Sequence, residues 1–290
     1  MPVPLSAAGT RHARHRNPIE WLDAYTTTYY YCPSLALWRA LEAEALGEEP
    51  ITGPSLDVGA FDGSFSASWL DDRGPIDVGV DLDPRPSRFT TRAYRHLVAG
   101  DAQRLPFADR SFNFVLCNSV VEHIPDDIQA VREMARVLNP GGTLLMSTPS
   151  IHFHDALHTV KSARKRGDEA AARAHMAAID RRAAHHRYRA LEEWTSILHE
   201  AGLRLVAHLY CVPPSAAESW ERWDRLGIRR ILGRDLHGYL SSRKLARIVP
   251  PAFWKSIFKT ALGRTYTAAV AEQERPGAIG VDLVMRAVRE

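Results

Sequence analysis

The chain has few cysteines and no long apolar run. Cys32, Cys117 and Cys211 stand far apart and are odd in number, which argues against a disulfide framework or a zinc–cysteine site and favours a reducing compartment. No stretch approaches the roughly 18 apolar residues of a membrane span, and the first residues lack the apolar core of a signal peptide. We therefore expect a cytoplasmic globular protein with one large domain and an added lobe.

A large charge of one sign is also missing, because 37 Lys and Arg residues face 34 Asp and Glu residues. The basic excess lies in two late segments, since 161–190 holds nine basic residues against three acids and 218–264 holds eleven against four. These segments are either solvated helix faces or surfaces that attract an acidic ligand. Within 219–232 and 251–262, aromatic residues alternate with cations. This pattern occurs in a helix on a membrane surface and in a lid or dimer contact over a pocket.

A glycine-rich turn lies between an apolar strand and a helix. Residues 54–65 have the sequence P-S-L-D-V-G-A-F-D-G-S-F, in which Leu56–Val58 is closed by Gly59 and Gly63. A helical stretch, Phe65–Leu70, follows at once. Glycines let such a turn pass close to a ligand, and the first N–H groups of the helix point toward it. The order strand, turn, helix is typical of a nucleotide-binding α/β unit.

Strand-like and helical stretches alternate through the middle of the chain. Strands are predicted at Leu56–Gly59, Ile76–Leu82, His96–Gly100, Phe112–Ser119, Thr143–Ser147, Leu203–Tyr210 and Gly280–Val288. Helices are predicted at Phe65–Leu70, Asp126–Leu138 and Tyr188–Ala201, and a turn at Asn139–Gly142. Near-continuous apolar strands separated by crossovers predict an α/β fold with a parallel sheet covered on both faces.

The remaining segments are predicted to be helical additions to this domain. We expect a mobile tail at 1–17, an N-terminal helical cap at 18–47 that Pro33 splits in two, and a main domain at 50–290. Helical insertions are expected at 151–187 and at 212–276, the second with helices near 219–232, 236–248 and 252–262. Tyrosines are dense at 25–31, where they either close over a ligand or pack the cap against the main domain.

Three aspartates follow the predicted strands. Asp57 lies one residue before the turn, Asp81 ends the second strand and Asp101 follows the third. Ligands of parallel α/β sheets bind beyond the carboxyl ends of the strands, so these acids are expected around one crevice. An acid after the second strand suits ribose hydroxyls, one after the third suits an adenine amine, and Asp57 suits an ammonium group. A single such acid would more often be a helix cap.

These stretches resemble the class I S-adenosylmethionine-dependent methyltransferases, in the branch similar to the ubiquinone- and menaquinone-biosynthesis and small-molecule enzymes. The resemblance lies in L-D-V-G-A-F-D-G, V-G-V-D-L-D-P, L-P-F-A-D-R-S-F with the later V-E-H-I, and N-P-G-G-T-L-L-M-S-T-P. It covers Ser55–Tyr210 and the last strand. It implies a Rossmann-like, doubly wound, seven-stranded sheet whose last strand is antiparallel, with S-adenosylmethionine as cofactor.

Carried over residue by residue, the resemblance implies a set of cofactor-binding residues. Their expected places are the turn under the methionine part (Asp57, Gly59, Ala60, Gly63), the ribose and adenine (Asp81, Leu82, Asp101, Ala102) and the methionine end (Asn118). Phe61 replaces the family's middle glycine, which puts in doubt how closely the backbone approaches the cofactor there.

A general base is needed only for a hydroxyl or acidic-carbon acceptor. The candidates are His123 beside the fourth strand end and His152 or His154 after the fifth, with His185 and His186 as weaker ones. His123 belongs to the V-E-H-I phrase and has a structural interpretation as well.

A metal interpretation also exists for part of this set. His152, His154 and Asp155 could ligate an ion if both histidines faced one way on a strand. Most members of the family need no metal, so none is expected here.

We expect methyl transfer to a small molecule, most often at oxygen. The alternatives are a non-catalytic adenosyl-binding module and an RNA methyltransferase. Nothing in the sequence matches an RNA-binding module and the net charge is only +3, which argues against nucleic acid. A lipid-like substrate at a membrane surface and a homodimer stay open.

Overall fold

The computed structural model describes residues 3–4, 19–47, 49–71, 73–231, 234–242 and 249–290. Its centre is a sheet with strand order β1-β7-β10-β6-β5-β2-β3-β4. The strands are β1 (Val3–Pro4), β2 (Ser55–Val58), β3 (Ile76–Asp81), β4 (Tyr94–Ala99), β5 (Phe112–Asn118), β6 (Leu138–Pro149), β7 (Leu203–Cys211) and β10 (Asp282–Arg289). Only β10 runs antiparallel to its two neighbours, β6 and β7.

This sheet confirms the predicted seven strands with an antiparallel last one. The two-residue β1, which pairs in parallel with β7, is an addition at one edge. It is the described part of the segment expected to be a mobile tail, and the rest of 1–17 lies outside the described residues.

Alternating side chains of the strands divide the core into two halves. Phe114 and Leu116 of β5 pack into the core on one face of the sheet, whereas Val115 and Cys117 pack into the core on the other. Since successive strand side chains point to opposite faces, a run of apolar residues is buried twice. The doubly wound arrangement follows directly from these uninterrupted apolar strands.

Helices cover both faces. On one face lie α5 (Asp127–Val137) and α9 (Leu191–Glu200), and on the other α1 (Glu20–Thr28), α2 (Pro33–Leu46) and α3 (Ser64–Leu70). The short α4 (Thr90–Ala93) precedes β4, and a 3-10 turn, η2 (Val121–His123), follows β5. Pro33 stands at the start of α2 and separates it from α1, as predicted.

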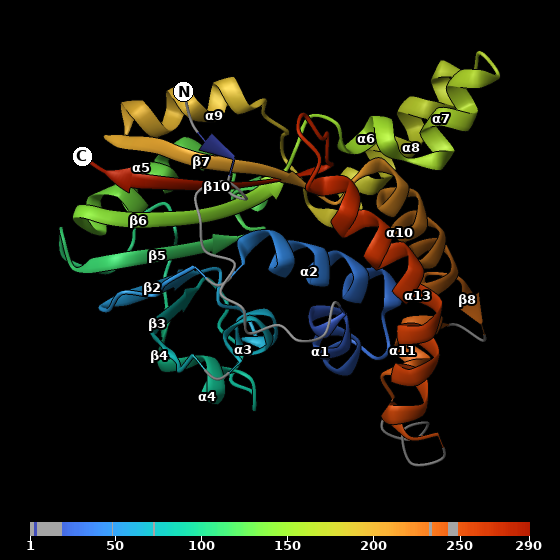
Figure 1. Ribbon diagram of the computed structural model, residues 1–290, viewed down its shortest axis with the longest axis horizontal. Helices are drawn as coiled ribbons and strands as arrows, with labels where there is room; N and C mark the ends of the chain where they lie inside the picture. Colours follow the sequence, from blue (N-terminus) through green and yellow to red (C-terminus); the bar gives the residue numbers. More distant parts are fainter. Residues whose placement is uncertain (1–2, 5–18, 48, 72, 232–233, 243–248) are drawn as a thin grey trace.

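The insertions gather at one end of the sheet, toward which the arrow of β6 points in Figure 1. They comprise α6 (Phe153–Ala156), α7 (His158–Lys165), α8 (Glu169–Ala183), α10 (Pro214–Gly227), the hairpin β8 (Arg230–Ile231) and β9 (Arg234–Asp235), α11 (Leu236–Leu240) and α13 (Pro251–Gln273). Among the described helices, none is both long and apolar enough to cross a membrane.

One local prediction was wrong, and one predicted helix is longer than expected. The turn expected at Asn139–Gly142 is part of β6, where the pairing with β5 shifts register and Gly141 has a φ of 78°. The helix expected at 252–262 continues to Gln273, because Tyr266 is buried and its hydroxyl donates to Glu44 of α2 over 2.9 Å. Of the helix expected at 236–248, residues 243–248 lie outside the described part.

The aromatic residues of the two basic segments pack against each other. Trp223 of α10 meets Phe258 of α13 edge to face at 5.7 Å, and Trp254 stacks on the same ring at 6.1 Å. Lys255 and Lys259 pair with Asp23 of α1 at 3.1 and 2.5 Å. The late basic helices thus pack on each other and on the N-terminal helix α1.

Candidate functional site

A cavity of about 460 Å³ lies beyond the carboxyl ends of β2, β3, β4 and β5. Eight of the nine predicted cofactor residues line it: Asp57, Gly59, Ala60, Asp81, Leu82, Asp101, Ala102 and Asn118. Its volume falls in the range of small-molecule sites. The structure therefore brings together side chains that the sequence spreads over some sixty residues.

The glycine turn is held in a shape that few other residues adopt. Gly59 has a φ of 87°, and a Cβ there would lie 2.2 Å from the side chain of Val120. Gly63, the ninth predicted residue, does not line the cavity. It has a φ of 72° and packs against the backbone of Thr90, where a Cβ would come within 2.8 Å. Gly59 shapes the cavity floor, and Gly63 fixes the turn behind it.

Asp57 is buried beneath the turn. One of its carboxylate oxygens accepts hydrogen bonds from Ser66 at 2.5 Å and Tyr94 at 2.6 Å. Burial raises the pKa of this carboxyl to about 6, although these two hydrogen bonds lower it. The group therefore stands in an apolar setting that favours a nearby positive charge.

Asp81 and Asp101 lie at the more open side of the cavity. Asp81 accepts from the backbone N–H groups of Phe61 at 2.9 Å and Asp83 at 2.8 Å. Asp101 accepts from the N–H of Gln103 at 2.8 Å. Because a carboxylate has lone pairs beyond those used here, both can accept further hydrogen bonds from a ligand.

Phe61 occupies the middle-glycine position in a left-handed conformation, with a φ of 41°. Its ring is 45% exposed and lies under the guanidinium of Arg85 at 4.7 Å. Leu82 is 78% exposed at the same rim. The exposed apolar side chain of Leu82, beside Asp81 and Asp101, is suited to pack on a flat ring such as a nucleobase.

Asn118 ends β5 at the inner side of the cavity. Its Oδ1 accepts from Ser147 at 2.8 Å. Its Nδ2 is buried and has no hydrogen-bond partner within the described chain. An unpaired buried donor costs free energy, so a ligand acceptor at this point would be stabilised.

The wall opposite the strands comes from the helices. Tyr29 directly after α1, Arg39 of α2 and Phe65 of α3 line the cavity. Tyr29 belongs to the tyrosine-rich stretch, whereas Tyr25 is fully buried and its hydroxyl donates to the backbone of Phe65. The stretch thus packs against the main domain through Tyr25 and contributes one side chain, Tyr29, to the cavity. Nothing in the sequence pointed to Arg39, since a helical pattern does not show which residue faces a distant strand end.

A group of buried charges lies behind this wall. Arg39 pairs with Glu42 at 2.7 Å, and Glu42 is completely buried and also accepts from Ser119. Burial raises the pKa of Glu122 to about 8 and that of Asp282 well above its usual range. The four charged side chains, from α2, η2 and β10, were not predicted as a group.

Of the three predicted histidine bases, His123 lines the cavity and the other two do not. The side chain of His123 is 41% exposed, and burial of its ring lowers its pKa. His152 lies against Tyr210, with ring centres 5.8 Å apart. His154 Nε2 is 2.8 Å from Asp180. Residues 151–156 form a turn and the helix α6 rather than the strand that the metal interpretation required.

His185, a weaker candidate, lies closer to the cavity than either of these. Its ring centre is 5.2 Å from that of His123. Burial lowers the pKa of His185 to about 4. His185 lies beside the end of β5 because of the path that the chain takes after α8. No local sequence pattern predicts this position.

Residues 56–146 match the model of a family described as "Methyltransferase domain". An uncharacterized methyltransferase of Mycobacterium sp. (strain JLS) is 36% identical over 113 residues, which are 38% of this chain and 43% of the relative. A demethylmenaquinone methyltransferase of Beutenbergia cavernae is 36% identical over 127 residues, 42% of this chain and 52% of the relative. The chain thus spans about half the length of the curated relatives it matches.

Among solved structures, the chain is similar to a Thermotoga maritima protein described as a SAM-dependent methyltransferase, possible histamine N-methyltransferase. The two are 14% identical, with a TM-score of 0.47 and coverage of 88% of this chain and 90% of that one. The family match falls on the strands and turns that surround the cavity. Residues 56–146 are therefore identified as a methyltransferase domain by their match to this family.

Proposed function

We propose that this protein transfers a methyl group from S-adenosylmethionine to a hydroxyl of a small molecule. One observation carries the proposal: Asp57, Asp81 and Asp101, from three neighbouring strand ends, meet around one cavity. Members of the matched family use this cofactor. Two acids at the open side and a buried acid beneath the glycine turn match a ligand with hydroxyls, an amine and an ammonium group.

Each lining residue has a role that its surroundings permit. Asp81 would hold the ribose hydroxyls, with Leu82 packed on the adenine and Asp101 and Ala102 at its edge. The turn from Asp57 to Gly63 would lie under the methionine part. The unpartnered Nδ2 of Asn118 would donate to the methionine end. When bound, the cofactor supplies an electrophilic methyl group, so the protein has to hold the acceptor in line and exclude water.

The helical wall would bind the acceptor. Tyr29, Phe65 and Arg39 offer two aromatic surfaces and a cation beside Asn118, and the buried sheet end excludes water from that side. A hydroxyl acceptor has to lose its proton as the methyl group arrives. His123, from the turn after β5, lines the same cavity, which supports an oxygen acceptor because a nitrogen acceptor needs no base.

Isothermal calorimetry with S-adenosylhomocysteine tests the proposal. Wild type should bind, and Asp81→Ala should bind about 10- to 100-fold more weakly, because hydrogen bonds to a charged group contribute about 1.5–3 kcal/mol. Asp83→Ala is the matched control: Asp83 is two residues away, 75% exposed and paired with Arg85. Absence of binding to wild type, or equal binding by both variants, would contradict the proposal. Methylation of a hydroxyl compound in an acceptor screen then tests the chemistry.

A further inference from the structure

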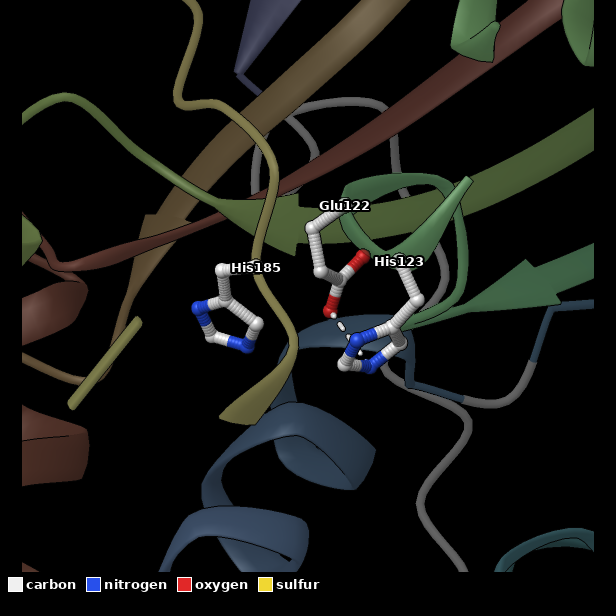
Figure 2. A group of neighbouring side chains, drawn as sticks. All are labelled: Glu122, His123 and His185. Atoms are coloured by element: carbon white, nitrogen blue, oxygen red, sulfur yellow. Dashed lines mark ion pairs between the residues drawn. The ribbon is translucent and has the colours of Figure 1, made fainter. Parts of the chain in front are cut away.

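The side chains of Glu122, His123 and His185 converge, as Figure 2 shows, and His123 lines the cavity. Glu122 and His123 belong to η2, directly after β5, and His185 lies in the link between α8 and α9. One potential ligand atom from each lies within 4.8 Å of the others. A carboxylate and two imidazoles separated by some sixty residues are thus placed together by the fold.

The hydrogen bonds of the two histidines leave one nitrogen of each ring free. His123 Nδ1 is 3.3 Å from the carbonyl oxygen of Ala184, which can only accept, so Nδ1 carries the hydrogen. His185 Nδ1 is 2.9 Å from the hydroxyl of Tyr188, which donates to Asp180 at 2.6 Å. His185 Nδ1 therefore donates to Tyr188. Both Nε2 atoms keep their lone pairs, which is the arrangement that supports histidine metal ligands.

Glu122 supplies the anionic ligand. Its side chain is 1% exposed, and its Oε2 has no hydrogen-bond partner in the part of the chain that the structure describes. His123 Nε2 lies 3.8 Å from its other oxygen. A buried carboxylate oxygen without a donor is costly unless a cation or proton occupies the site.

The surrounding charges favour a cation. Glu42, Glu122 and Asp282 are buried and lie within electrostatic range of one another, and Arg39 is the basic group among them. If all three carboxyl groups are ionised, they exceed the one guanidinium by two negative charges, and burial disfavours that state unless a cation is present. A divalent cation would balance this excess, whereas burial of uncompensated charge is strongly unfavourable.

We propose that Glu122, His123 and His185 bind a divalent transition-metal ion at the edge of the cavity. Two imidazoles and one carboxylate suit zinc or manganese better than magnesium or calcium, which prefer oxygen ligands alone. Three protein ligands leave a coordination position for an acceptor oxygen, as in catalytic zinc sites. The resemblance to the family predicted no metal. The alternative metal site at His152, His154 and Asp155 is disfavoured, because His154 contacts Asp180 and Asp155 pairs with Arg164.

The role of this ion rests on the proposed function. Bound to the acceptor oxygen, it would lower the pKa of the hydroxyl. The O–H bond breaks and the proton passes to solvent. The oxygen electron pair forms the new O–C bond, and the S–C bond breaks with its electrons remaining on sulfur. His123 is then a ligand and not the general base.

Metal binding is tested without cofactor or acceptor. Full-length protein stripped with a chelator is titrated with ZnCl₂ and, separately, MnCl₂ in a calorimeter. We expect one site with a micromolar or lower Kd for at least one of the two ions. His185→Ala and Glu122→Gln should weaken it at least 100-fold. His199→Ala, an exposed histidine on α9, is the control and should leave the site intact, which separates it from surface binding by the other histidines.

Cobalt(II) gives a second measurement, because its visible spectrum reports ligation by imidazole and carboxylate. The wild-type spectrum should change in His185→Gln, a second variant for the case in which His185→Ala does not fold. Absence of a tight site in wild type, or binding that both His185 variants retain, would overturn the proposal. S-adenosylhomocysteine affinity is measured in parallel. If the protein fails to bind metal but binds S-adenosylhomocysteine, only the metal site is contradicted. If it binds metal but not S-adenosylhomocysteine, only the proposed function is contradicted.

Discussion

The two walls of the cavity differ in how they are built. The strand wall consists of short loops after β2 to β5 and is shaped by backbone geometry, with Asp81 and Asp101 at its open side and Asp57 buried beneath it. The helical wall takes Tyr29 from the end of α1, Arg39 from α2 and Phe65 from α3, and buried charges lie behind it. The family match covers the strand wall and stops before the insertions.

This difference indicates a division of labour. Under the proposed function the strand wall holds S-adenosylmethionine, and a local pattern of glycines and acids is enough to specify its geometry. The helical wall would meet the acceptor, which differs between enzymes. The described parts of the insertions 151–187 and 212–276 lie at the end of the sheet toward which β6 points. We therefore expect changes in the two walls to affect different properties.

The largest effect is expected from Arg39→Ala in the helical wall. The completely buried Glu42 would lose its cation, which should lower the free energy of unfolding by about 3–4 kcal/mol. Lys161→Ala removes an exposed pair with Glu218 at 2.9 Å and should cost less than about 1 kcal/mol. Urea denaturation measures both. Similar losses in the two variants would show that burial does not distinguish these pairs.

Next comes Gly59→Ala in the strand wall. The left-handed φ and the collision with Val120 should together cost about 3 kcal/mol of unfolding free energy. Gly167→Ala is the control from an insertion, with a similar φ of 75° and no atom within 4 Å of the new Cβ. It should cost about 1 kcal/mol. Equal costs in denaturant would mean that Val120 moves aside freely.

The buried acid of the strand wall predicts a pH dependence. Because the pKa of Asp57 is about 6 in the folded state and near 3.8 when exposed, folding takes up a proton between these values. Its contribution is therefore present at low pH and is lost as pH rises through about 6, by at most about 3 kcal/mol. Asp57→Asn should remove this slope in denaturation measured from pH 4 to 7.

Tyr94→Phe sharpens the same test. Tyr94 donates to the Asp57 carboxylate, so its removal should raise the pKa of Asp57 further and move the loss of stability to higher pH. A slope that stays the same in both variants would assign the pH dependence to other groups.

The smallest effect is expected at the rim. Phe61→Gly restores the family's middle glycine, relieving the left-handed φ while losing an exposed contact with Arg85. Since the backbone N–H that donates to Asp81 is kept, S-adenosylhomocysteine affinity in calorimetry should change less than about threefold. A tenfold gain would indicate that the ring obstructs the cofactor.

The sequence alone was sufficient for the sheet and for the strand wall. Apolar runs of strand length, a glycine turn and acids at three successive strand ends are local patterns, and a parallel sheet brings such ends together wherever the connections run. The sequence was less reliable in predicting where a strand begins. The segment 139–142 has turn residues yet continues β6, because Leu138 already pairs with Phe112 of β5.

Only the tertiary structure decided which residues form the helical wall and which histidine stands beside it. Arg39 has an ordinary place in an amphipathic helix, and His185 lies in a histidine-rich link with no regular pattern. Their positions depend on how α2 and the chain after α8 pack against β5, more than sixty residues away in sequence. Helical periodicity specifies which face is buried but not what that face meets, so the acceptor side of the site required the packed fold.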